Sequence, residues 1–115
     1  MFLRSQDNHQ DIVGVISGKL EMEIGRANGH IYTLAVDSKC RGRGLGTKLM
    51  TAFEHEMIKA SCRANVDLVS LSLETKSSDQ LARRFYEKLG FESVLERKDY
   101  YYGTIDSVVM EKRWT

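Results

Sequence analysis

The chain has 115 residues, of which 42% are hydrophobic and 29% charged, and its formal net charge is +1. This length and composition predict a single globular domain over residues 1–115. The small net charge argues against a nucleic-acid-binding or acidic-membrane-binding surface, and no apolar run approaches the ~20 residues of a membrane-spanning helix. The two cysteines, Cys40 and Cys62, lack metal-type spacing and the three histidines are scattered, so we expect free thiols in a reducing compartment, the cytoplasm, and no metal site.

The first half of the chain reads as three strands followed by a helix. Apolar and alternating stretches predict strands over residues 1–5, 12–24 and 30–36, with turns at 6–10 and at Ala27-Asn28-Gly29. Apolar residues then recur at every fourth position from Leu45 to Met57, which predicts a helix over about 44–63. A buried strand over 66–73 follows this helix.

The second half begins with a shorter helix. Ser77 and Gln80 have the spacing of a capping box, and Leu81, Phe85 and Leu89 are predicted on the core face. Gly90 is expected to end the helix, with Phe91 folding back on it, before strands around 92–97 and 104–112. The predicted order is β-β-β-α-β-α-β-β, an α+β fold in which helices pack on a mixed sheet.

The segment Arg41-Gly-Arg-Gly-Leu-Gly46 lies between the third strand and the first helix. Three glycines at alternate positions let a ligand approach the backbone, and the helix dipole favours negative charge at this point. A Walker loop would end in Gly-Lys-Ser or Gly-Lys-Thr, and a dinucleotide loop would place its third glycine where Thr47 stands. The segment therefore predicts another kind of polyphosphate site, with an ordinary glycine-rich turn as the alternative.

Three stretches resemble the GNAT N-acetyltransferases. They are Ile31-Tyr-Thr-Leu-Ala-Val36 with the glycine-rich loop, Leu73-Glu-Thr75 with Ala82-Arg-Arg-Phe-Tyr-Glu-Lys-Leu-Gly-Phe91, and Asp99-Tyr-Tyr101 with Asp106-Ser-Val-Val-Met110. The last stretch is similar to the branch that acetylates protein N-termini, both the bacterial ribosomal-protein type and the eukaryotic type.

The resemblance implies that the loop binds acetyl-coenzyme A as a co-substrate. The backbone around Leu34–Val36 would hydrogen-bond the pantetheine arm, and the amides from Arg41 through Thr47 would hold the pyrophosphate. The implied cofactor-binding residues are Leu34, Ala35, Val36, Arg41, Gly42, Arg43, Gly44, Leu45, Gly46, Thr47 and Tyr86.

The resemblance also implies the catalytic residues. Tyr86 would protonate the leaving thiolate and Glu74 would act as the base, while His30, Tyr100 and Tyr101 would contact the acceptor. Each has a plainer alternative: Tyr86 as an aromatic beside the core, Glu74 in a salt bridge or in solvent, His30 as a surface residue, and the tyrosines as exposed loop aromatics.

The implied function is transfer of an acetyl group to a primary amine, with the N-terminal α-amine of a protein as the expected acceptor. Acetylation of a small amine or a lysine, or non-catalytic binding of acetyl-coenzyme A, are the alternatives. Ser78-Asp79 stands where the branch usually has Ser-Asn. The family's usual first strand and two helices, which form one wall of the substrate groove, are not found, so we expect an N-terminally truncated domain whose wall comes from a second copy or a partner chain.

Overall fold

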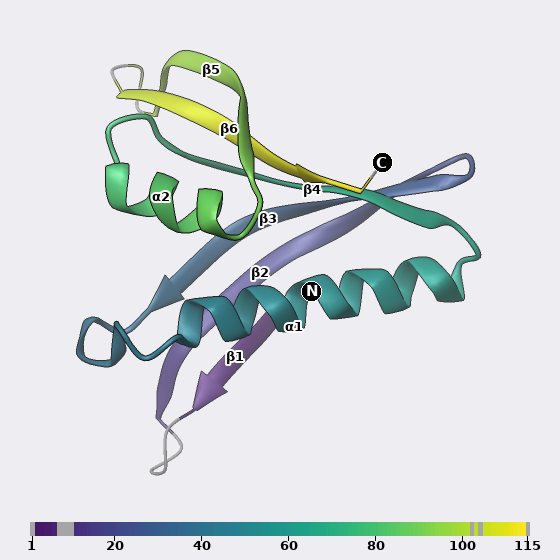
Figure 1. The fold of residues 1–115 in the computed structure, drawn as a ribbon, viewed down its shortest axis with the longest axis horizontal. Coiled ribbons are helices and arrows are strands. Elements are labelled where there is room, and N and C mark those ends of the chain that lie inside the picture. Colours follow the sequence, from purple (N-terminus) through teal and green to yellow (C-terminus); the bar gives the residue numbers. More distant parts are fainter. Residues whose placement is uncertain (1, 7–10, 102, 104, 115) are drawn as a thin grey trace.

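The computed structural model describes residues 2–6, 11–101, 103 and 105–114 (Figure 1). Residues 7–10, in the turn predicted at 6–10, lie outside this described part. The elements are β1 (Phe2–Gln6), β2 (Ile12–Glu23), β3 (Arg26–Val36), a 3-10 helix (Ser38–Cys40), α1 (Leu45–Arg63), β4 (Asp67–Lys76), α2 (Gln80–Lys88), β5 (Glu92–Tyr101) and β6 (Ile105–Arg113). Apart from the added 3-10 helix, this is the predicted α+β order.

The strands form one mixed sheet in the order β1-β2-β3-β4-β6-β5. Strands β3 and β4 are parallel, because α1 carries the chain back across the sheet between them (Figure 1). The other neighbouring strands described are antiparallel. Pairing between β3 and β4 stops at His30 and Ser72, although both strands continue. Beyond that pair the sheet is split.

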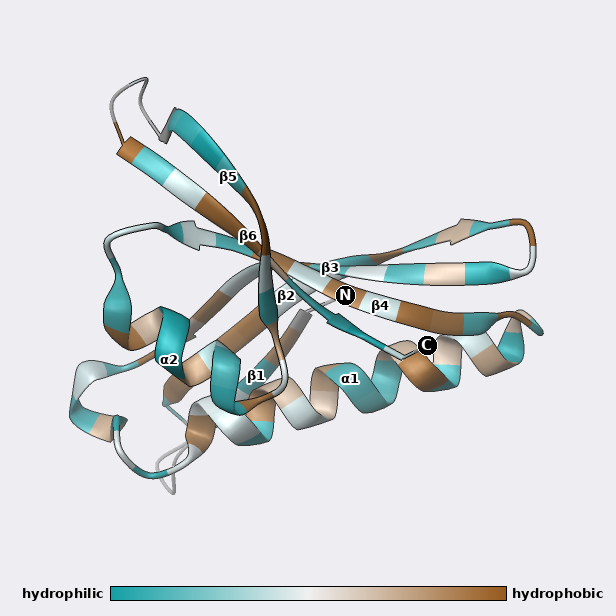
Figure 2. Ribbon diagram, turned by 45° about the horizontal axis from the view of Figure 1, so that its top comes forward, coloured by the Kyte–Doolittle hydropathy of each residue, from teal (hydrophilic) through white to brown (hydrophobic). Residues whose placement is uncertain are grey.

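Both helices cover the same face of the sheet (Figure 2). The core lies between them and the strands, and its fully buried side chains include Ile16, Met50, Phe53, Leu71, Phe91 and Met110. The opposite face has no helix of the described part of the chain. Neither described helix is long and apolar enough to cross a membrane.

The turn between β2 and β3 lies earlier than the sequence predicts. Glu23 pairs with Arg26 across Ile24 and Gly25, Gly25 has a φ of 76°, and Arg26 Nε lies 2.8 Å from Glu23 Oε2. The predicted turn residues are part of β3 instead. Asn28 accepts a hydrogen bond from Ser70 at 2.7 Å, and Gly29 lies against Leu71. Contacts with β4 thus override the local turn preference.

The start of α2 also differs from the prediction. Asp79 is the N-cap, and its carboxylate accepts a hydrogen bond from the Ala82 backbone at 3.1 Å, so the capping box from Ser77 is wrong. Leu81 is 79% exposed and is not a core residue, because it lines a cleft beside the start of α1.

The end of α2 is as predicted. The Phe91 amide donates to the Tyr86 carbonyl and the Gly90 amide donates to the Glu87 carbonyl, both at 3.0 Å. This is the hydrogen-bond pattern of a Schellman cap, and it brings the Phe91 ring into the core. The cap fixes where Tyr86 lies relative to the sheet.

Candidate active site

A cleft of about 600 Å³ lies between the end of β3, the start of α1 and one face of α2. We call it the donor cleft. Every cofactor-binding residue predicted from the sequence lines it except Arg43. Residues far apart in the chain, from Leu34 to Tyr86, therefore meet in one place.

The start of α1 presents backbone amides to the donor cleft. The N-cap is Gly44, which has a left-handed φ of 75° and supplies no side-chain cap. The first helical hydrogen bond is that from the Lys48 amide to the Gly44 carbonyl, at 3.0 Å. The amides before Lys48 have no earlier turn of the helix to bond, the residues that carry them line the cleft, and the positive end of the helix dipole lies beside them. This arrangement is suited to phosphate groups.

The sequence reading missed the α2 side of the donor cleft. Asp79, Leu81, Ala82 and Phe85 line it, together with Cys40 from the loop. A Cβ atom on Gly46 would lie 3.1 Å from the Phe85 ring, so α1 and α2 approach each other closely at this glycine. The spacing of Leu81, Ala82, Phe85 and Tyr86 places them on one face of the helix, and this spacing could have predicted that the first three line the same cleft as Tyr86.

A second cleft, of about 410 Å³, occupies the split between β3 and β4. It shares Leu34, Asp79, Ala82 and Tyr86 with the donor cleft. A β-bulge shapes its β3 side, because Ser17 pairs with Thr33 and Gly18 pairs with Ile31, which leaves Tyr32 without a ladder partner on β2. We call this second cleft the split.

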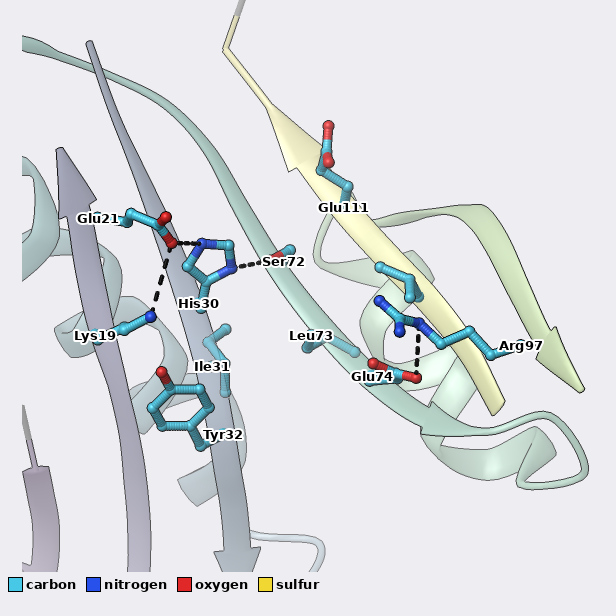
Figure 3. A pocket seen from close by; sticks show the side chains of 11 residues that line it. Lys19, Glu21, His30, Ile31, Tyr32, Ser72, Leu73, Glu74, Arg97 and Glu111 are labelled. Carbon is cyan, nitrogen blue, oxygen red and sulfur yellow. Dashed lines mark hydrogen bonds and ion pairs between the residues drawn. The ribbon is translucent and has the colours of Figure 1, made fainter. Parts of the chain in front are cut away.

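A third pocket, of about 590 Å³, opens on the face of the sheet that has no helix (Figure 3). It shares Ile31, Tyr32, Leu73 and Glu74 with the split. The donor cleft therefore shares lining residues with the split, and the split shares others with the open-face pocket. Together they run from the helix face of the sheet to the open face. Tyr86 stands where the donor cleft joins the split, and Glu74 stands where the split joins the open-face pocket.

Glu74 and Tyr86 are held by different kinds of contact. Glu74 Oε2 accepts a hydrogen bond from Ser107 Oγ at 2.6 Å and lies 3.3 Å from Arg97 Nε, so the salt bridge considered from the sequence is present (Figure 3). The Tyr86 ring makes edge contacts with the rings of Phe85 and Phe91, at centroid distances of 5.4 and 6.0 Å. The ring thus packs beside the core while lining two clefts.

His30 lines the open-face pocket. Its Nδ1 lies 2.7 Å from Ser72 Oγ and its Nε2 lies 3.0 Å from Glu21 Oε2. The other predicted acceptor contacts are not placed, since the side chains of Tyr100 and Tyr101, and all of Tyr102, lie outside the described part of the chain. Their role stays a prediction.

The strand that carries these tyrosines is tied to β6. Asp99 has a φ of 53°, and its amide donates to Asp106 Oδ1 at 2.8 Å. This hydrogen bond, with the nearby Lys98 ammonium, lowers the pKa of Asp106 below its ordinary value. The charges of Glu96 and then Asp106 raise the pKa of Lys98. The contacts fix the backbone where β5 enters the loop.

The sequence profile of the acetyltransferase (GNAT) family matches residues 1–91. The chain belongs to this family. Solved structures share this fold: Chaetomium thermophilum Naa20, in complex with a bisubstrate analogue, has a TM-score of 0.84 at 24% identity, and the match covers 97% of this chain and 65% of that one. Arabidopsis thaliana Naa50, in complex with the bisubstrate analogue CoA-Ac-MVNAL, has a TM-score of 0.73 at 28% identity and covers 90% and 66%.

The chain spans only part of the length of the curated relatives that it matches. An uncharacterized N-acetyltransferase of Methanocaldococcus jannaschii, MJ1530, is 36% identical over 103 residues, which is 89% of this chain and 60% of the relative. Human N-alpha-acetyltransferase 30 is 34% identical over 106 residues, 91% of this chain and 27% of the relative. The chain thus spans between about a quarter and 60% of these GNAT proteins.

Proposed function

We propose that this GNAT domain transfers the acetyl group of acetyl-coenzyme A to the N-terminal α-amine of a protein. The observation that carries the proposal is the series of joined clefts. A donor bound at the start of α1 and an acceptor bound on the open face would meet in the split between β3 and β4. The named relatives that acetylate protein N-termini support the acceptor class.

The two proposed catalytic side chains lie on opposite sides of the meeting point. Tyr86, beside the donor cleft, would donate its hydroxyl proton to the sulfur as the C–S bond breaks, because a phenol of ordinary pKa about 10 keeps its proton at pH 7 and can hydrogen-bond to the developing thiolate. Glu74, beside the open-face pocket, would accept a proton from the amine nitrogen as the C–N bond forms. Arg97 and Ser107 hold its carboxylate in place.

The chemistry of the acceptor favours an α-amine over a lysine. An α-amine has a pKa of about 7.7–8.0, so roughly a tenth of it is neutral at pH 7, whereas a lysine at about 10.4 is neutral about once in 2,500 molecules. This gap corresponds to about 3.5 kcal/mol that a site must supply before lysine reacts. Glu74, a single carboxylate that is already paired with Arg97, is suited to removing a proton from an α-amine rather than from a lysine.

A matched pair of peptides tests the acceptor. One has a free N-terminus and a blocked lysine, and the other has a blocked N-terminus and a free lysine. We expect faster thiol release from acetyl-coenzyme A with the first peptide, measured with a thiol reagent. Faster release with the lysine peptide would defeat the α-amine assignment and leave the transferase standing. No release with any peptide or small amine, despite binding of acetyl-coenzyme A, would favour a non-catalytic binding module.

The reducing cytoplasm is the proposed compartment. Cys40 and Cys62 are both free thiols, and one of them, Cys40, lines the donor cleft. A disulfide-forming environment would expose that thiol to oxidation at the site where the donor binds.

A further inference from the structure

Three polar side chains form a line across the open face of the sheet (Figure 3). Ser72 on β4 and Glu21 on β2 each contact one ring nitrogen of His30, which lies on β3 between them. The line therefore runs from the half-buried Ser72 hydroxyl, through an imidazole that is 34% exposed, to a carboxylate that is 54% exposed. It connects the interior of the pocket with solvent.

The register of the strands explains this line. His30 is directly opposite Ser72 in the parallel ladder, and this is the last pair before β3 and β4 separate. Lys19 is opposite His30 on β2, and Glu21, two residues further on, lies on the same face and contacts both. The line thus begins at the edge of the split, where the proposed acceptor amine would react.

The proposed reaction has a proton that Glu74 alone does not remove. An α-amine is mostly an ammonium at pH 7. It must lose one proton before it attacks the thioester and another as the amide forms. Overall, the ammonium and the thioester give the amide, the thiol and one free proton. Of the two protons that the nitrogen loses, one is balanced by the proton that Tyr86 gives to the thiol. The other proton must reach solvent.

We propose that Ser72, His30 and Glu21 form a relay that carries this proton from the acceptor ammonium to solvent. The ammonium N–H gives its proton to Ser72 Oγ, while the Ser72 hydroxyl proton passes to His30 Nδ1. The imidazolium then releases its Nε2 proton to Glu21 or to water. In this relay Ser72 is the catalytic residue, and His30 and Glu21 are positioning residues. The inference rests on the proposed transfer to an α-amine.

The hydrogen bonds give the relay its direction. The Glu21 carboxylate accepts only, so it selects the imidazole tautomer with hydrogen on Nε2 and leaves Nδ1 as the acceptor for the Ser72 hydroxyl. Ordinary cross-strand packing does not require this arrangement, because none of the three side chains is buried. The other charged groups around the pocket are Lys19 from β2, Glu74 from β4, Arg97 from β5 and Glu111 from β6.

Enzyme kinetics with the free N-terminus peptide test the relay. At about pH 6.5, where the α-amine is almost all ammonium, we expect His30→Gln and Ser72→Ala each to lower kcat/KM by about tenfold or more. At about pH 9, where the amine is largely neutral, we expect less than about a twofold effect. Added imidazole should restore much of the low-pH activity of His30→Gln. The matched control is His55→Gln, an exposed histidine on α1, which should behave as wild type.

Two outcomes overturn the relay. One is wild-type activity of both variants at the lower pH; the other is an equal loss at both pH values with no response to imidazole, which would indicate a structural role. Either result is distinct from failure of the proposed function, which the wild-type protein alone would reveal by acetylating no α-amine. Thermal unfolding of each variant checks that it is folded when it is assayed.

Discussion

Tyr86→Phe is expected to lower kcat by about 10²-fold or more while the affinity for acetyl-coenzyme A changes little. Phenylalanine keeps the ring that contacts Phe85 and Phe91, so the packing beside the core is conserved. It removes only the hydroxyl group of a residue that lines both the donor cleft and the split. The variant should therefore slow the step in which the thiolate leaves.

The measurement for Tyr86 is a comparison of steady-state turnover with acetyl-coenzyme A binding by calorimetry. An unchanged dissociation constant with a reduced kcat identifies a lost proton donor. Wild-type turnover of the variant would show that Tyr86 is only an aromatic residue packed beside the core, which is the plainer interpretation of the sequence. A large fall in donor affinity would instead show that the hydroxyl group binds the donor.

Gly44→Val and Gly46→Val are each expected to weaken acetyl-coenzyme A binding by tenfold or more, or about 1.4 kcal/mol. The two variants act by different means. A β-branched residue is strained at the φ of 75° of Gly44, which would displace the amides at the start of α1. A side chain on Gly46 meets the Phe85 ring and pushes α2 away from the donor cleft.

The chain offers a matched control for the backbone strain. Gly25 has a φ of 76°, and a Cβ atom there meets nothing within 4 Å, as is also true of Gly44. Gly25→Val therefore carries the same local strain in the β2–β3 turn, away from the donor cleft. The readout is the rise in unfolding temperature that acetyl-coenzyme A produces. The rise should persist in Gly25→Val and be lost in Gly44→Val; a full rise in both cleft variants would contradict the assignment of the loop.

The strand, loop and helix from His30 to Arg63 could be predicted from the sequence because their signals are local. Apolar periodicity and glycine spacing are readable within one segment. The resemblance predicted that Tyr86 belongs to the same site, and Tyr86 lines the donor cleft; its catalytic role stays a prediction. The α2 side of the donor cleft was missed because a helix face has no preferred direction until its partner is known.

The errors occurred where contacts between distant segments decide the structure. Asn28-Gly29 is a strong local turn signal, yet Ser70 and Leu71 hold both residues in β3. The polar line through His30 depends on a parallel register between β3 and β4 that no short pattern reveals. Alternation along each strand predicts which side chains share a face, but not which neighbours they meet.

The joined clefts have a consequence for the kinetic order of the proposed reaction. In the proposed reaction the donor and the acceptor would enter from opposite faces of the sheet, so neither would have to leave before the other arrives. Both can be present together and react directly, and no acetylated enzyme needs to form, even though Ser72 has an imidazole and a carboxylate in line behind it. The thiol and the acetylated product would then leave on opposite faces of the sheet, so neither would block release of the other.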